Sequence, residues 1–342
     1  MRWDIGIDLG TESVRMADGK QGPFKESAAA LAFREGRDTP VYGGDAAEKL
    51  EGRVCEGIEI QRPLKDGVLE NNFTADRMFH WIYRQADVLS RRRRFSMLLT
   101  CAPFARPVLR DAMISAAIDA GADCVALVRG DSAAAIGAGL DLDAPEAKLV
   151  VDIGAGKISA TLFTLGRIAS YGYLPYGMNR IDERVQRGIR LNYGYRIGRS
   201  SAREIKHTLG TALPNAAASD VLMHMTGFSI SERVPKVFDV ETRPVLEACE
   251  DVVREIIGLV ASVVDNAPEE LSADLTDAGA VLTGAGAELT GLNKRLGDAL
   301  GIPCRVADAP GTCAIRGVYQ MMLNPEKYSQ AILDQRMSAN WR

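Results

Sequence analysis

Two stretches of the chain place an acidic residue two positions before the first glycine of a turn. Asp152 ends an apolar run and is followed by Ile153-Gly154-Ala155-Gly156, and Asp8 is followed by Leu9-Gly10-Thr11 in the same arrangement. Glycine in such a turn allows positive φ and a close approach of the backbone to a phosphate. The two aspartates supply hard oxygen atoms that would approach a Mg²⁺ ion, usually through its water molecules.

A third glycine turn follows residues 280–283, an apolar run, and consists of Gly284, Ala285 and Gly286 before the start of a helix. A helix N-terminus after glycines suits the ribose or phosphate of a nucleotide. Each stretch alone also fits an ordinary β-hairpin or turn. The order of two phosphate hairpins and then an adenosine turn predicts a nucleotide site between two similar halves.

The elements around these turns alternate between strands and helices. Residues 96–102 and 124–128 are expected to be strands, with a helix over 106–120 between them. This alternation predicts a parallel crossover and therefore an α/β fold. Further helices are expected over 74–89, 132–140, 243–264 and 317–323. The polar tail, residues 324–342, is expected to fray.

Composition narrows the class of protein. The 342 residues are 46% apolar and 25% charged, which suits two lobes, and the net charge of −4 gives no reason to expect a nucleic-acid partner. Six cysteines without a C-x-x-C pair suggest neither a zinc site nor a disulfide framework. The apolar run 256–264 is shorter than the ~20 residues that span a bilayer, and no signal peptide is expected. We therefore expect a cytoplasmic protein.

Several motifs together resemble the actin/Hsp70/sugar-kinase superfamily and, within it, the MreB family of bacterial actins. The resemblance rests on residues 7–11, 62–68 (Arg-Pro-Leu-Lys-Asp-Gly-Val), 133–140, 151–154, 281–284 and 307–313. It implies a two-lobed actin-like ATPase fold, with duplicated RNase H-like halves, a nucleotide cleft between them and a small outer subdomain on each. The first lobe would comprise 1–142 and 318–342, with its outer subdomain near 25–73. The second would comprise 143–317, with its outer subdomain near 180–240.

The resemblance also implies a set of ligands for ATP or ADP with Mg²⁺. Asp8 and Asp152 would organise the metal. Lys206 matches a family residue that clasps the nucleotide, whereas Arg203 stands where the family has a glutamate; an exposed charged helix face is the alternative for both. The nucleotide-binding positions implied are Gly10, Thr11, Glu12, Gly154, Ala155, Gly156, Lys157, Gly177, Arg203, Lys206, Gly284, Ala285 and Gly286.

Other positions depart from the family pattern. The glutamate that positions the attacking water corresponds to Gly130, and the following proline to Asp131, a candidate substitute whose side chain is shorter and displaced by one residue. Lys157 replaces a usual threonine and could pair with the γ-phosphate as a point charge. Glu12 replaces a small residue and would face phosphate. We therefore expect ATP binding, with hydrolysis slow, altered or lost.

Four consecutive arginines, Arg91, Arg92, Arg93 and Arg94, precede Phe95. They fit a solvated basic loop or a membrane-surface patch, since each arginine contributes on the order of 1 kcal/mol near anionic lipid and an exposed aromatic can insert. In the MreB family this loop belongs to the membrane-facing surface. The second interpretation predicts a peripheral position at the inner face of the membrane.

Three functions remain open at this point. The first is a polymerising bacterial actin that determines cell shape by scaffolding cell-wall synthesis, with itself, cell-wall elongation proteins at the inner membrane and an anionic membrane surface as partners. The outer subdomains would then supply the filament contacts, because family members stack tip to base. The second is a non-polymerising ATP-binding adaptor. The third is a small-molecule kinase, but this sequence shows no second carboxylate in a sugar-site motif.

Overall fold

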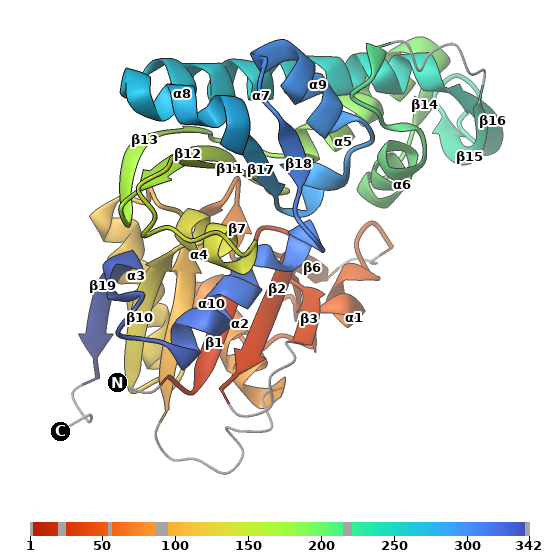
Figure 1. The fold of residues 1–342 in the computed structure, drawn as a ribbon. Coiled ribbons are helices and arrows are strands. Elements are labelled where there is room, and N and C mark those ends of the chain that lie inside the picture. Colours follow the sequence, from red (N-terminus) through yellow and green to blue (C-terminus); the bar gives the residue numbers. More distant parts are fainter. Residues whose placement is uncertain (1–2, 20–24, 54–56, 86–94, 215–220, 339–342) are drawn as a thin grey trace.

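The computed structural model describes residues 3–19, 25–53, 57–85, 95–214 and 221–338. Figure 1 shows two lobes, each built on a β-sheet, with helices α4 and α10 between the sheets. The chain has the two-lobed α/β architecture expected from its sequence. The lobe boundaries expected near residues 142 and 318 stay a prediction.

The two sheets repeat one topology. In each sheet, three consecutive strands form an antiparallel meander. Two further strands extend the sheet in parallel beyond the first strand of that meander. The first sheet has the order β19-β10-β9-β1-β2-β3, and the second β13-β12-β11-β17-β18. The strands of the first sheet are β1 (Ile5–Leu9), β2 (Ser13–Asp18), β3 (Lys25–Ala28), β9 (Ser96–Cys101), β10 (Cys124–Arg129) and β19 (Ile332–Met337). Those of the second are β11 (Lys148–Ile153), β12 (Ile158–Thr164), β13 (Arg167–Leu174), β17 (Ala280–Thr283) and β18 (Cys304–Val306).

Helices cover both faces of the first sheet, so its central strands are apolar almost throughout. α2 (Asn72–Gln85) and α3 (Pro107–Asp119) pack on one face, and α10 (Cys313–Leu323) on the other. α10 begins four residues before the helix expected over 317–323, and α4 (Gly130–Gly137) begins two residues before the one expected over 132–140. Burial on both faces fixes the position at which each central strand ends, and the tight turns of the site begin at these strand ends.

α4 and α10 cross at very short range because glycine lies at both contact points. A Cβ placed on Gly137 would lie 1.8 Å from the carbonyl oxygen of Cys313, and one on Gly317 would lie 1.8 Å from that of Ala133. The two helices therefore pack against each other by backbone contact rather than by interdigitated side chains.

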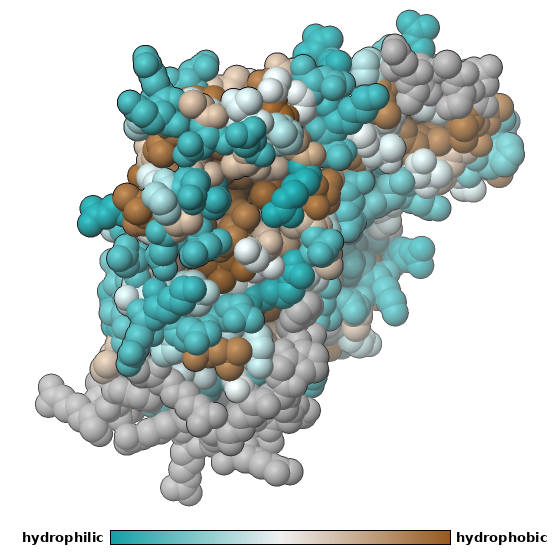
Figure 2. Space-filling model, viewed as in Figure 1, coloured by the Kyte–Doolittle hydropathy of each residue, from teal (hydrophilic) through white to brown (hydrophobic). Residues whose placement is uncertain are grey.

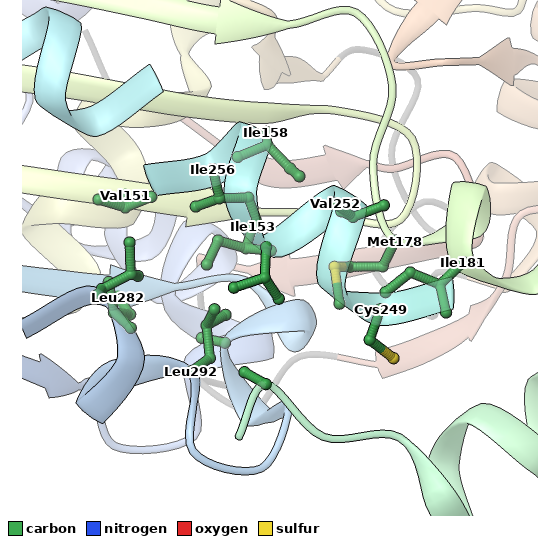
Figure 3. Close-up of a cluster of buried hydrophobic side chains, with 14 of the residues drawn as sticks. Val151, Ile153, Ile158, Met178, Ile181, Cys249, Val252, Ile256, Leu282 and Leu292 are labelled. Atoms are coloured by element: carbon green, nitrogen blue, oxygen red, sulfur yellow. The ribbon is translucent and has the colours of Figure 1, made fainter. Parts of the chain in front are cut away.

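The second lobe is organised around α7 (Thr242–Asp265). Its apolar face meets the second sheet, and Figure 3 shows Cys249, Val252 and Ile256 of α7 beside Ile158 and Met178. Burial of each such side chain contributes about 1.5–3 kcal/mol of transfer free energy. The remaining helices of this lobe are α5 (Asn179–Gly188), α6 (Arg199–Leu209), α8 (Glu269–Ala278) and α9 (Leu292–Leu300), with the π-helical turn η2 (Ile189–Tyr193).

Each lobe also carries a small outer sheet. In the first lobe it comprises β5 (Tyr42–Gly43), β4 (Leu31–Arg34) and β6 (Ile58–Gln61), with α1 (Asp45–Glu48) and the hairpin of β7 (Leu64–Lys65) and β8 (Val68–Leu69). In the second lobe it comprises β14 (Tyr195–Arg196), β15 (Leu222–Ser229) and β16 (Pro235–Glu241). Short 3-10 turns η4 (Ala285–Glu288), η5 (Pro310–Thr312) and η6 (Ser329–Ala331) complete the fold.

Three expectations from the sequence are wrong in detail. The tail does not fray over its described part, because β19 pairs antiparallel with β10 and forms the edge of the first sheet. A regular helix does not start directly after the third glycine turn, which leads into η4, and α9 begins only at Leu292. Phe95 is not an exposed aromatic, since it is 7% exposed and packs edge-on against Tyr83. Residues 91–94, the four arginines, lie outside the described residues.

Candidate functional site

The two glycine hairpins close in the same way. The N–H of Gly10 donates to the carbonyl of Ser13 at 2.9 Å, and the N–H of Gly154 donates to that of Lys157 at 2.9 Å. A Cβ on either glycine would lie 2.9–3.0 Å from the accepting oxygen, so any larger residue would open the turn. Each turn therefore presents backbone at the position where the first strand of its hairpin ends.

The hairpins face one another across the cleft between the lobes. A Cβ on Gly156, in the second hairpin, would lie 2.2 Å from Oγ1 of Thr11, in the first. The same hydroxyl accepts a hydrogen bond from the N–H of Gly67, at 3.2 Å, in the turn between β7 and β8. The two lobes thus meet at this point with no room for another side chain.

One pocket is lined by all three glycine turns. Of the residues predicted from the sequence, its lining includes Asp8, Gly10, Thr11, Glu12, Asp152, Gly154, Ala155, Gly156, Lys157, Gly284 and Ala285, with Gly130 beside them. It also includes residues that the sequence did not single out, among them Arg15, Thr100, Pro310 and Gly311. Residues 307–313 belong to the motifs of the resemblance, so a signal for Pro310 and Gly311 was present. No signal in the sequence pointed to Arg15 or Thr100, which line the pocket from strands β2 and β9.

Two predicted glycines support the turns from behind and do not belong to the lining. A Cβ on Gly177 would lie 2.3 Å from the carbonyl oxygen of Gly154, and the next residue, Met178, donates its N–H to that oxygen at 3.0 Å. A Cβ on Gly286 would lie 2.5 Å from both Ile153 and Met178. These glycines are required by packing around the second hairpin.

Both aspartates of the hairpins already face a cation of the protein. Asp152 lies 3.2 Å from Nζ of Lys157, and Asp8 lies 3.7 Å from the guanidinium of Arg15 and accepts a hydrogen bond from Thr100 at 2.8 Å. Burial raises the pKa of Asp8, and the nearby Arg15 only partly offsets it. For Lys157, burial lowers the pKa, but the neighbouring carboxylates, Asp152 foremost, outweigh it and the pKa is raised. Lys157 is therefore held as an ammonium ion.

Gly130 lines the pocket, whereas the side chain of Asp131 points elsewhere. The Asp131 carboxylate is 1% exposed and accepts hydrogen bonds from Arg129, at 2.9 and 3.2 Å, from the Ser132 N–H at 2.7 Å and from Thr161 at 3.0 Å. A Cβ on Gly130 would lie 3.7 Å from Nζ of Lys157. At the position where the resemblance implies a carboxylate, this chain has only backbone facing an ammonium group.

Glu12 lies at the centre of an ionic cluster that joins the outer subdomains of both lobes. Its carboxylate accepts hydrogen bonds from Arg199 and Arg203 on α6 and from Asn179 at 2.7 Å, and lies 3.6 Å from Arg62. The same arginines pair with Glu48 and Glu51 of the first lobe, Arg203 to Glu48 at 3.0 Å and Arg62 to Glu51 at 2.8 Å. We refer to Glu12, Glu48, Glu51, Arg62, Arg199 and Arg203 as the Glu12 cluster.

The charges of the cluster change the acidity of its central carboxyl. Burial raises the pKa of Glu12, but the guanidinium groups of Arg62, Arg199 and Arg203 outweigh it, so the pKa is lowered. Glu12 faces the pocket, as expected, and it is also held by three arginines that no sequence signal connected with it. Arg203 lies in this cluster and Lys206 pairs with Asp182 at 2.7 Å, and neither of them belongs to the lining of the pocket. Their expected contacts with a nucleotide stay a prediction.

The described side chains around the two aspartates do not form an all-protein metal site, so the expectation that Asp8 and Asp152 organise Mg²⁺ through its water molecules stays a prediction. Across the ranges that the structure describes, no group of three or more Asp, Glu, His or Cys side chains is placed to hold a metal. Each aspartate has a cationic side chain beside it instead. The donor set is therefore that of two internal ion pairs.

Comparison with known proteins gives one family. The family described as MreB/Mbl protein matches residues 2–330. The cell shape-determining protein MreB of Escherichia coli (strain K12) is 34% identical over 320 residues, covering 92% of this chain and 91% of that protein.

Solved structures give the same fold. MreB5 of Spiroplasma citri superimposes with a TM-score of 0.88 when bound to AMPPNP and 0.87 when bound to ADP, at 24% identity, and the AMPPNP structure covers 95% of this chain and 97% of that one. The MamK double helical filament superimposes with a TM-score of 0.76 at 18% identity, covering 94% of this chain and 98% of that one. These solved structures share the overall fold of this chain.

Proposed function

The chain belongs to the MreB/Mbl family, and on this premise we propose that it binds ATP and ADP between its lobes and polymerises into actin-like filaments. The observation that carries the proposal is the pocket lined by both glycine hairpins and by the Gly284–Ala285 turn. Backbone N–H groups at such turns suit phosphate oxygens. The two structures of MreB5, with ADP and with AMPPNP, support a nucleotide as the ligand.

We propose that hydrolysis by this chain is slow or altered. Hydrolysis needs a held water molecule and a group that orients it. Gly130 offers no side chain for this purpose, and Lys157 lies against it. Asp131, the other candidate from the sequence, already accepts hydrogen bonds from Arg129, Ser132 and Thr161. The nucleotide would then act mainly by setting the conformation of the two lobes.

Self-association is supported by an apolar tip on the outer subdomain of the second lobe. Figure 2 shows apolar residues gathered over β15 and β16, and Val237 is 68% exposed. Exposed apolar residues that cluster mark interaction surfaces. The exposed apolar residues of this hairpin are Val221 and Leu222 at one end and Ile230, Val234 and Val237 towards the other. We propose that the tip contacts the next subunit of a filament.

The direct test is sedimentation of the purified protein with ATP, with ADP and without nucleotide, with the pellet examined by negative-stain microscopy. We expect filaments with ATP. The variant Val237→Lys should stay in the supernatant, whereas Val108→Lys, at a valine on α3 that is 76% exposed, should sediment as the wild type does. If both variants lose sedimentation to the same extent, the β15–β16 tip is not the specific filament contact.

Binding itself is tested with a fluorescent ADP analogue. Gly156→Val places a side chain where a Cβ would lie 2.2 Å from Thr11, so it should abolish binding, whereas Gly258→Ala, on the open face of α7, should not. Binding that survives Gly156→Val would place the nucleotide elsewhere.

A peripheral membrane position and a role in scaffolding cell-wall synthesis are further parts of the proposal. Among the described residues no helix is long and apolar enough to cross a bilayer. Surface binding is supported by the run of four arginines at 91–94 in the sequence. Co-sedimentation with vesicles containing anionic lipid should be lost when all four are replaced by alanine. Unchanged co-sedimentation would assign membrane binding to another surface.

The altered positions Gly130 and Lys157 also favour a second function, a non-polymerising ATP-binding adaptor of the same fold. A protein that binds the ADP analogue but stays monomeric with ATP would support this alternative. Filaments in the same assay would exclude it.

A further inference from the structure

The stem of Lys157 is held from both lobes. Its carbonyl closes the second glycine hairpin by accepting the N–H of Gly154 at 2.9 Å. From the other lobe, the turn between β7 and β8 packs against the side chain, since a Cβ on Gly67 would lie 2.9 Å from Cβ and 3.0 Å from Cδ of Lys157. Gly67 itself has φ +71°, which favours glycine, so the close contact is built into the turn. The lysine is therefore positioned by the closed cleft.

The ammonium group lies where the two hairpins present their carboxylates. Nζ of Lys157 is 3.2 Å from Asp152, and Lys157 lines the same pocket as Asp8. On the other side of the pocket, the guanidinium of Arg15 lies 3.7 Å from Asp8 and 2.6 Å from Glu26. Each aspartate is thus already paired with a cation of the protein, which weakens the attraction of the two carboxylates for a divalent ion between them.

We propose that Lys157 takes the place of the divalent cation in this pocket, so that ADP and ATP bind to this chain without Mg²⁺. The ammonium offers three N–H donors and a compact positive charge to the phosphate oxygens, and Arg15 adds a second cation at the first hairpin. The inference rests on the proposed function, because it concerns the same nucleotide pocket. It assigns to a side chain the charge neutralisation that phosphate binding requires.

The experiment compares binding of a fluorescent ADP analogue to the full chain in excess Mg²⁺ and in excess EDTA. For the wild type we expect the two dissociation constants to agree within about threefold. Lys157→Met keeps an unbranched stem and removes the charge, and it should weaken binding in EDTA by about tenfold or more. Lys294→Met, at an exposed lysine on α9, is the matched control and should behave as the wild type does.

Each outcome decides between the two proposals. A wild type that binds ADP only with Mg²⁺ would overturn this inference and leave the nucleotide-binding function intact. Absence of binding under both conditions would overturn the proposed function and this inference with it. Should Lys157→Met fail to fold, as judged by circular dichroism, the wild-type comparison still decides. Lys157→Thr then gives a second measurement, since it should make binding dependent on Mg²⁺.

Discussion

Replacement of Glu12 by glutamine tests whether the Glu12 cluster holds the two lobes together. The substitution preserves the shape of the side chain and an oxygen that can accept from Asn179, but it removes the charge that faces Arg62, Arg199 and Arg203. Three guanidinium groups would then lie close together with only Glu48 and Glu51 opposite them. We expect the variant to be less stable.

The size of the effect follows from the degree of burial. Breaking a fully buried ion pair costs about 3–5 kcal/mol, and an exposed pair is worth about 0–1 kcal/mol. The Glu12 side chain is 16% exposed and those of the three arginines are 11–29% exposed. The cluster lies between the two limits, and we expect the free energy of unfolding at pH 7 to fall by about 2 kcal/mol.

Urea unfolding followed by circular dichroism measures this difference. The control is Glu247→Gln, in an exposed pair with Arg243 on α7, which should change the free energy of unfolding by less than about 0.5 kcal/mol. Equal stability of Glu12→Gln and the wild type at pH 7 would refute the assignment of a stabilising role to the cluster.

The pH dependence gives a second check. The pKa of Glu12 is lowered from its usual 4.5 because the arginines outweigh burial. A carboxyl with a lowered folded-state pKa stabilises the protein fully above its unfolded pKa, and this contribution is lost as the pH falls through the folded-state value. The gap in stability between wild type and Glu12→Gln should therefore be complete at neutral pH and should narrow below pH 4.5. A gap that does not change with pH would mean that charge is not the cause.

Three further changes are predicted. Asp131→Asn should leave phosphate release from ATP within about twofold of the wild type, because the Asp131 carboxylate is committed to protein donors; a much larger loss would restore Asp131 as a base. Gly317→Ala should destabilise the protein by about 3 kcal/mol in urea unfolding, since its Cβ would lie 1.8 Å from a carbonyl of Ala133, whereas Gly258→Ala on open α7 should stabilise by up to about 1 kcal/mol. Deletion of residues 332–342 should lower the unfolding temperature and increase light scattering, because it uncovers the edge of β10; an unchanged melting curve would show that β19 adds no stability.

The turns of the site could be predicted because their signals are local. Asp8 and Asp152 each stand at the end of an apolar strand, and glycines follow within the same hairpin. Backbone geometry at such positions depends on neighbours in sequence, so residue type and spacing suffice. The alternation of strands and helices likewise predicted the α/β class, and the repeated hairpin predicted two similar halves.

Two of the three errors came from contacts between distant segments. The tail was expected to fray because its sequence is polar, but an edge strand needs only one covered face, and β10 supplies the pairing for β19. Phe95 follows four arginines in the sequence and was assigned to their surface. It belongs instead to the core beneath β9, where it contacts Tyr83.

By itself, the sequence determined the fold class, the two glycine hairpins, the third glycine turn and the departures at Glu12, Gly130 and Lys157. Only the tertiary structure decided what those departures contact: Glu12 meets arginines of both lobes, and Lys157 lies between Asp152 and Gly130. The physical reason is that turn conformation is set over a few bonds, whereas ion pairing is set by distance in space. The charge of a side chain is visible in the sequence, and the partner that neutralises it is fixed only when the lobes close.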